Sequence, residues 1–153
     1  MTTTIASPDA LLDMAGADLG TSDWAEIAQS DVDAFASATK DDQWIHVDPV
    51  RAAAGPFGGT IVHGYMTLAM LVPLLHNTFQ VGGVAMGINY GLNKVRFPAP
   101  APVGARVRVH ARLVSAERVS GGVQAVLDST VEAEGVAKPV CVAQSIVRYY
   151  PSP

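Results

Sequence analysis

Cysteine and charged residues are both scarce in this chain. A single cysteine, Cys141, occurs among 153 residues, which excludes an internal disulfide framework and a metal site built from several cysteines. Charged residues make up 16% of the chain, and the formal net charge is −4. Because nucleic-acid binders neutralise phosphates with an excess of lysine and arginine, that class of protein is not expected. Cys141 stands in an apolar run, so we expect a small buried hydrophobe there.

Positive charge is absent from the first quarter of the chain. No lysine or arginine precedes Lys40, whereas a secretory signal needs a positively charged segment ahead of an apolar one. The longest apolar stretch, residues 65–75, is too short to span a bilayer and contains Pro73. The sequence therefore predicts a cytoplasmic protein that makes no membrane contact.

Hydrophobic residues, in contrast, make up 49% of the chain. A chain of this length and composition can bury one sizeable core and has little room for a second domain. We therefore expect residues 1–153 to form a single domain, with residues 1–20 as an N-terminal extension or short helix.

Strands are predicted mainly in the second half of the chain. Residues 103–115 and 123–133 alternate between apolar and polar side chains, the pattern of a half-buried strand. Ser120, Gly121 and Gly122 form the expected hairpin turn between them. Further strands are expected at residues 86–97 and 140–149, and an early one within residues 23–29.

Helices are predicted in the first half. A sequence similar to a capping box, Ser30-Asp31-Val32-Asp33, predicts a helix from about Asp31 to Thr39. A short helical turn should follow at residues 49–54. Residues 63–79 are apolar on nearly every side, which indicates a long buried helix that Pro73 bends. The order of elements predicts an α+β fold in which a curved antiparallel sheet wraps around that helix.

Two short segments contain the residue types needed for proton transfer beside a carbonyl group. Asp41 and His46 stand five positions apart in an expected loop, and the glycine-rich segment at residues 58–66 opens the apolar helix. An Asp and a His in a loop are more often simply solvated, and the adjoining helix start favours the catalytic interpretation. For His63, a structural role in orienting the turn before the helix is favoured over direct chemistry.

These two segments resemble the signature of the MaoC-like hydratases, also called R-specific enoyl-CoA hydratases. The segment Gln43-Trp44-Ile45-His46-Val47-Asp48 is similar to the corresponding sequence of the NodN-like branch and of 3-hydroxyacyl-thioester dehydratases. The resemblance implies a hot-dog fold, a homodimer with a site near its interface, and an acyl-CoA thioester as substrate in fatty acid metabolism. It also implies that Asp41 and His46 are catalytic and that the amide of Gly64 stabilises an oxyanion.

The expected chemistry is the addition of water across a trans-2-enoyl thioester. A base must deprotonate the water, a proton must reach Cα, and the enolate oxygen must be stabilised. We assign the base to Asp41 and the orientation of the water to His46, a division that can be reversed. Expected substrate-binding residues are Gly64, Tyr65, Asn89 and Asn93. No metal and no cofactor is required, because coenzyme A is part of the substrate.

Other features leave alternatives open. Arg106, Arg108 and Arg112 form a solvated strand face or else meet the phosphates of coenzyme A, and Lys94 with Arg96 carries the same two interpretations. Lys40 stands where the family usually has glycine, which favours a non-catalytic acyl-thioester binding protein. A hot-dog thioesterase is the third possibility, because a single carboxylate can also direct water at the carbonyl carbon.

Overall fold

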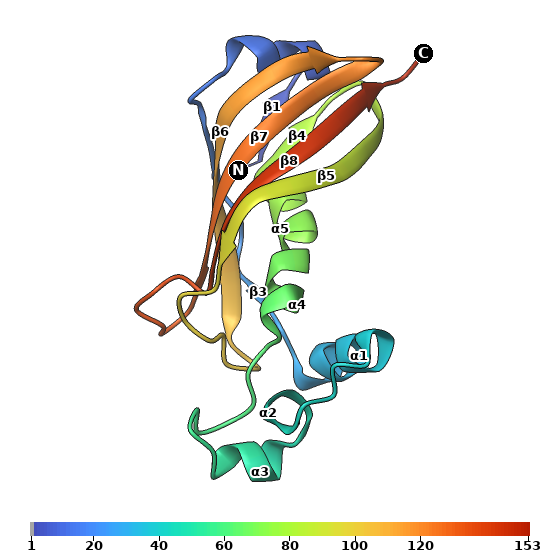
Figure 1. The fold of residues 1–153 in the computed structure, drawn as a ribbon. Helices are drawn as coiled ribbons and strands as arrows, with labels where there is room; N and C mark the ends of the chain where they lie inside the picture. Colours follow the sequence, from blue (N-terminus) through green and yellow to red (C-terminus); the bar gives the residue numbers. More distant parts are fainter. Residues whose placement is uncertain (1) are drawn as a thin grey trace.

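The computed structural model describes residues 2–153, and its main element is a curved antiparallel sheet (Figure 1). The spatial order of the strands is β2-β6-β7-β8-β5, and the short strand β3 also pairs with β6. Their bounds are Asp18–Thr21 (β2), Ala25–Glu26 (β3), Val84–Arg96 (β5), Arg106–Val119 (β6), Gly122–Ala133 (β7) and Cys141–Pro151 (β8). The predicted order of four long strands in the second half of the chain is confirmed.

Alternation along β6 and β7 explains which face of the sheet is buried. Val107, Val109, Ala111 and Leu113 of β6 are fully buried or nearly so, and the residues between them carry the polar groups. Strand β7 repeats the pattern over its whole length. Cys141, at the start of β8, is buried as expected, and burial raises the pKa of its thiol to about 11. The thiol is therefore neutral and acts as a small core hydrophobe.

The apolar helix predicted at residues 63–79 is bent into two segments on the concave side of the sheet, α4 (Gly64–Ala69) and α5 (Leu71–Thr78). The break lies at Met70 because Pro73 has no N–H to offer the carbonyl of Ala69, and its ring crowds that carbonyl. The bend is thus confirmed, but a single continuous helix is wrong. Leu71, Leu74 and Leu75 face the core.

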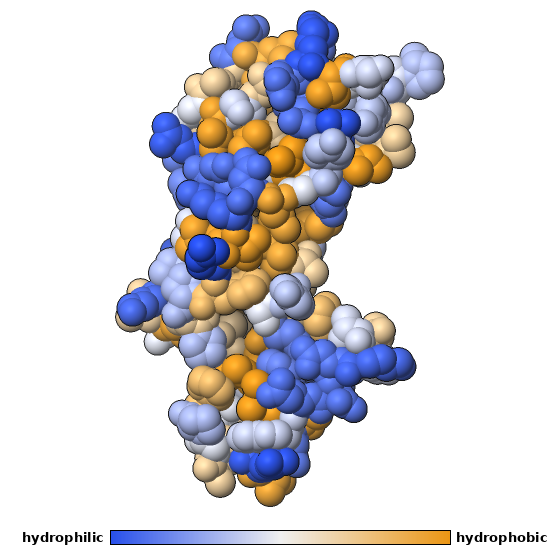
Figure 2. Space-filling view, in the orientation of Figure 1, coloured by the Kyte–Doolittle hydropathy of each residue, from blue (hydrophilic) through white to orange (hydrophobic). Residues whose placement is uncertain are grey.

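Full burial of this helix is also not found in the single chain. Tyr65 is 73% exposed, and Val72 is exposed as well. Strand β5, at the edge of the sheet, adds further exposed apolar side chains: Met86, Ile88, Tyr90, Leu92 and, just after the strand, Phe97. Figure 2 shows the hydrophobic surface around α4, α5 and β5. We call this set of exposed residues, which borders the free edge of β5 from both sides of the sheet, the β5 face.

The N-terminal residues belong to the core and do not form an extension. Strand β1 (Thr3–Ile5) pairs in parallel with β4 (Phe79–Val81), and a 3-10 helix follows at Pro8–Asp13. Leu11 and Leu19 are completely buried. The expected short helix is therefore present, but the chain around it is tied to the end of α5.

Three short helices form a lobe beyond one end of the sheet (Figure 1): α1 (Gln29–Thr39), α2 (Trp44–Val47) and α3 (Pro49–Ala53). Helix α1 begins two residues before the predicted start, and the Asp31 carboxylate accepts a hydrogen bond from the Ala28 N–H at 2.9 Å. His46, expected in a loop, lies on the single turn of α2. No helix in residues 2–153 is long and apolar enough to cross a membrane.

Candidate active site

The end of α1 places Asp41 at the inner side of the lobe. Helix α1 stops at Thr39, and Lys40 adopts the left-handed conformation with φ 66° and ψ 15°. The Lys40 N–H donates to the carbonyl of Ala36 at 2.8 Å, which closes the helix. Since a left-handed residue reverses the direction of the chain, Asp41 leaves the helix axis with its carboxylate exposed to solvent.

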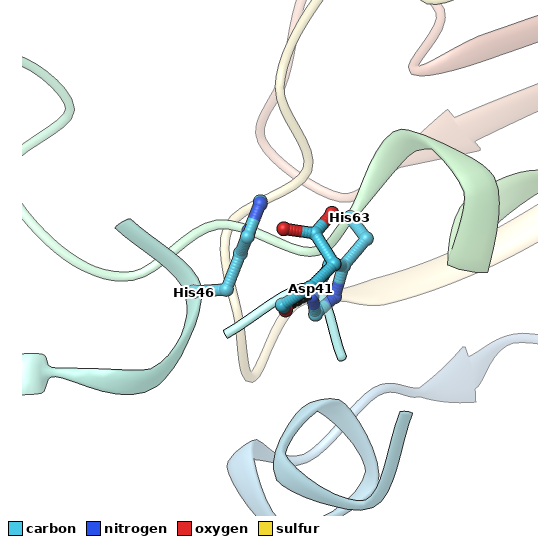
Figure 3. A group of neighbouring side chains, drawn as sticks. All are labelled: Asp41, His46 and His63. Atoms are coloured by element: carbon cyan, nitrogen blue, oxygen red, sulfur yellow. Dashed lines mark hydrogen bonds between the residues drawn. The ribbon is translucent and has the colours of Figure 1, made fainter. Parts of the chain in front are cut away.

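His46 approaches Asp41 from α2. Its side chain is only 6% exposed, and Nδ1 lies 2.7 Å from the carbonyl oxygen of Ile61. A carbonyl oxygen only accepts, so Nδ1 carries the hydrogen, and in the neutral ring Nε2 holds the lone pair. Figure 3 shows the Asp41 carboxylate and the outer nitrogen of His46 on the same side of the cluster. The structure therefore brings together the two residues that the sequence singled out.

His63, the residue before α4, completes this cluster. One polar atom from each of Asp41, His46 and His63 lies within 4.8 Å of the others. The Nε2 of His63 lies 2.8 Å from the backbone carbonyl of Asp41, and its ring stacks on the ring of His46 with centroids 3.8 Å apart and planes 23° apart. Phe35 packs against the His63 ring at 4.9 Å. His63 thus contacts both predicted catalytic residues.

The three side chains are of types that bind metals, but their geometry does not converge on one ion. The lone pair of an imidazole nitrogen lies in the plane of its ring. With the rings of His46 and His63 stacked, an ion in the plane of one ring lies well out of the plane of the other. The cluster is better suited to holding a water molecule between the carboxylate and one imidazole.

Gln29 and Thr60 support the cluster from outside; Thr60 lies within the second segment noted in the sequence, whereas Gln29 was not singled out. The Gln29 side-chain amide donates to the backbone carbonyl of His46 at 2.7 Å and accepts from the Thr60 hydroxyl at 2.7 Å. The Ile61 N–H donates to the carbonyl of Ile45 at 2.9 Å. The segment from Thr60 to His63 therefore holds both halves of the site through contacts of Thr60 and Ile61 that the sequence does not reveal.

Gly64 opens α4 directly after His63, and its surroundings require glycine. A Cβ at this position would lie 2.9 Å from the ring of Phe97, a distance that real Cβ atoms do not adopt. Tyr65, expected to bind substrate, points largely into solvent and meets the Phe97 ring edge-on at 6.3 Å. Phe97 was not expected at the site, because in the sequence it marks only the end of a strand before Pro98.

A cavity of about 700 Å³ lies between α5 and the inner sides of β5 and β8. Its lining is mostly apolar and includes Leu68, Leu75, Gly91 and Val147. Asn89 lines the cavity, as expected. Asn93 does not: it lies where β5 bulges, and its amide donates to Gln144 at 2.9 Å. Leu68 stands one helical turn after Gly64, so both residues share one side of α4.

The arginine stripe on β6 is engaged by neighbouring groups. Arg106 binds Glu134 through two hydrogen bonds, Arg108 pairs with Glu132, and Arg112 donates to the carbonyl of Gly16 at 3.1 Å. The bonds to Glu134 raise the pKa of Arg106, and the pKa of Glu134 is lowered in turn. The stripe is therefore a solvated strand face, the first of the two interpretations.

Lys94 and Arg96 lie on the exposed side of β5 near Phe97. Neither residue makes an ion pair within residues 2–153. Arg96 donates one hydrogen bond, to the carbonyl of Val95 at 2.8 Å. These two cations are available to an anionic group approaching the end of β5.

A curved sheet around a central helix, with an Asp and a His on an adjoining lobe, defines a hot-dog protein of the hydratase type. The model of the MaoC-like domain family matches residues 12–135, and the chain belongs to that family. It is 62% identical over 136 residues to 3-hydroxyacyl-thioester dehydratase Z of Mycobacterium tuberculosis, covering 88% of this chain and 90% of the relative. It is 40% identical over 144 residues to nodulation protein N of Rhizobium leguminosarum, with 90% and 88% covered.

Solved structures show the same fold at low sequence identity. The R-hydratase PhaJ1 from Pseudomonas aeruginosa superposes with a TM-score of 0.75 at 20% identity, covering 97% of this chain and 88% of that one. The (R)-hydratase from A. caviae gives a TM-score of 0.71 at 24% identity, with 90% and 96% covered. The predicted α+β hot-dog fold and the family resemblance are both confirmed.

Proposed function

We propose that this protein is a hydro-lyase that reversibly adds water to a trans-2-enoyl-CoA and forms an (R)-3-hydroxyacyl-CoA. The observation that carries the proposal is the pairing of Asp41 and His46 within 4.8 Å. Two hydrogen bonds of about 2.8 Å that meet at one water oxygen span roughly 4.6 Å. The upper limit of 4.8 Å leaves room for a single water held between the carboxylate and the imidazole.

The tautomer of His46 defines how His46 and Asp41 can each bind the water. With its Nδ1–H given to Ile61, the neutral ring offers Nε2 as an acceptor, as Asp41 offers its carboxylate. One proton of the water can point to each acceptor, which leaves an oxygen lone pair free to attack Cβ. Asp41 takes one proton as the C–O bond forms, and Cα then receives a proton from Asp41 or through His46. One molecule of water is added in total.

The enolate oxygen needs a donor on the opposite side of the thioester. Gly64 is the first residue of α4, and the first N–H groups of a helix have no partner within it. We assign the Gly64 amide to this oxygen. Because Gly64 directly follows His63, it is held next to the cluster by the chain itself.

The apolar cavity is the proposed binding place of the acyl chain. From Gly64, the same side of α4 leads to Leu68, which lines the apolar cavity. We infer that the acyl chain enters this cavity and that the coenzyme A portion remains outside, with no further cofactor. The similarity to a 3-hydroxyacyl-thioester dehydratase supports this class of substrate.

A homodimer is part of the proposal. The β5 face combines an unpaired strand edge with exposed apolar side chains, and such edges pair with another chain unless protected. We infer that a second copy covers this face and buries Tyr65 and Val72, which the sequence predicted to be inside. A cytoplasmic location remains a prediction from the sequence alone.

Turnover of crotonyl-CoA tests the proposal. Hydration removes the absorbance of the conjugated enoyl thioester and releases no thiol, whereas a thioesterase releases a thiol that a thiol reagent detects. Asp41→Asn and His46→Ala should lower the hydration rate by at least roughly 100-fold. Asp42→Asn, which removes the neighbouring exposed carboxylate, should leave it unchanged. Full activity in both site variants would contradict the assignment, and thermal stabilisation by acyl-CoA without turnover would indicate a binding protein.

A further inference from the structure

His63 lies against both residues to which the proposed reaction assigns chemistry, yet neither step uses it. Its side chain is 2% exposed. Its Nε2 is 2.8 Å from the backbone carbonyl oxygen of Asp41, and its ring lies flat on the ring of His46. No other side chain of the site contacts both residues in this way.

The hydrogen bonding of His63 fixes its tautomer. The carbonyl of Asp41 only accepts, so Nε2 carries the hydrogen, and in the neutral ring Nδ1 carries the lone pair. The Nδ1 atom is buried and has no hydrogen-bond partner within residues 2–153. A buried acceptor without a partner carries a free-energy cost that an apolar ring would avoid. The hydrogen bond that Nε2 donates to Asp41 is therefore the interaction that offsets this cost.

The same bonding excludes a direct role in the reaction. Nε2 is engaged by the main chain, and Nδ1 is enclosed by protein. Neither ring nitrogen is free to meet a water or a substrate. Whatever His63 contributes to the reaction, it contributes through Asp41 and His46.

The hydrogen bond from His63 is the stronger of the hydrogen bonds found at the main chain of Asp41. Its own N–H is 3.4 Å from the Thr39 hydroxyl, at the weak end of hydrogen bonding. The residue before it, Lys40, is in the left-handed conformation, which a side chain disfavours. The donor from His63 is thus the shortest hydrogen bond to the main chain of Asp41.

We propose that His63 is a positioning residue for the hydration reaction, which fixes the direction of the Asp41 carboxylate through its Nε2–H and the plane of the His46 ring by stacking. The inference rests on the proposed function. The two contributions are separable, because different substitutions keep one and remove the other.

Three substitutions test it. In His63→Gln the side-chain amide nitrogen reaches about as far as Nε2, whereas in His63→Asn it reaches only about as far as Nδ1. His63→Phe keeps an aromatic ring for stacking and has no donor. We expect kcat for crotonyl-CoA to fall by roughly 10- to 100-fold in the Asn and Phe variants, with KM little changed, because a small displacement of a catalytic group is costly. The Gln variant, which keeps the donor but not the ring, should recover part of the loss, and the part that it does not recover measures the contribution of stacking.

Hydrogen exchange gives a readout that does not depend on activity. The amides of residues 40–43 should exchange faster in the Asn and Phe variants than in the wild type and the Gln variant, while those of β6 and β7 should be unchanged. A role limited to general stability would instead raise exchange throughout, or lower Tm equally in all three variants.

The outcomes separate this inference from the proposed function. Absence of hydration in the wild type overturns the proposed function, and the role of His63 with it. An active wild type with unchanged kcat in all three variants overturns the positioning role alone. Equal losses in Gln and Asn show that the donor does not matter. If the Phe variant does not fold, the comparison of Gln with Asn still decides.

Discussion

Lys40 adopts a left-handed conformation directly before Asp41, the proposed base. It is the only non-glycine residue with a positive φ among residues 2–153. A lysine therefore makes the turn for which the family resemblance led us to expect glycine, and Asp41 still lies close to His46 and His63. The departure of Lys40 from the family pattern does not remove the site, which weakens the argument for a non-catalytic binding protein.

Replacing this lysine should stabilise the protein. Lys40→Gly should raise the free energy of unfolding by up to about 1 kcal/mol, because glycine adopts this conformation without steric cost. Part of the gain is offset by the greater freedom of the unfolded chain. Denaturant unfolding measures the change, and crotonyl-CoA turnover should be retained. Lys40→Ala is the control, because it removes the side-chain charge and keeps the strain; a larger gain in Ala than in Gly would contradict the explanation.

Gly64 should not tolerate even a methyl group. Gly64→Ala places Cβ 2.9 Å from the Phe97 ring, and such overpacking costs about 1–3 kcal/mol. Adding Phe97→Leu should restore Tm, because leucine is smaller and flexible. Turnover should recover less than Tm, since the methyl group still stands beside the amide assigned to the enolate oxygen. Complete recovery of kcat/KM in the double variant would show that the thioester does not approach Gly64 closely.

Gly91 offers a way to shorten the cavity. It lines the cavity, and a Cβ there would meet no atom within 4 Å. Gly91→Val should therefore leave crotonyl-CoA turnover intact while lowering kcat/KM for longer enoyl-CoAs by roughly tenfold or more. Gly59→Val is the matched control, since it also has free space but lies outside the cavity. An equal effect on short and long substrates would place the acyl chain elsewhere.

The β5 face predicts the oligomeric state. Ile88→Lys should convert the dimer to a monomer in sedimentation experiments, because it places a charge in an apolar interface. Val114→Lys is the control, since Val114 has nearly the same exposure, 37% against 39%, but lies on β6 away from this face. Dissociation by both substitutions, or by neither, would place the interface elsewhere.

Features with a local cause were predictable from the sequence. Alternation in β6 and β7 follows from the two faces of a strand, and the break at Met70 follows from Pro73. Asp41 and His46 could be paired because the turn after α1 and the single turn of α2 keep them close. Each of these depends on residues near one another in the chain.

Features that depend on residues far apart in the sequence were not predictable. The parallel pairing of β1 with β4 joins two three-residue strands from separate parts of the chain, and strands so short carry little pattern. The irregularity between Leu92 and Lys94 shifts the alternation of β5, which is why Asn89 lines the cavity and Asn93 does not. The hydrogen bond from His63 to Asp41 joins residues whose sequence positions give no sign of contact.

The cavity and the Asp41–His46 pair share no residue. The cavity belongs to α4, α5 and the sheet, whereas the pair belongs to the lobe of short helices. Mutations that reshape the cavity can therefore accumulate without disturbing Asp41 and His46. Such a division lets one ancestral chain give rise to descendants that accept different acyl groups while performing one unchanged reaction.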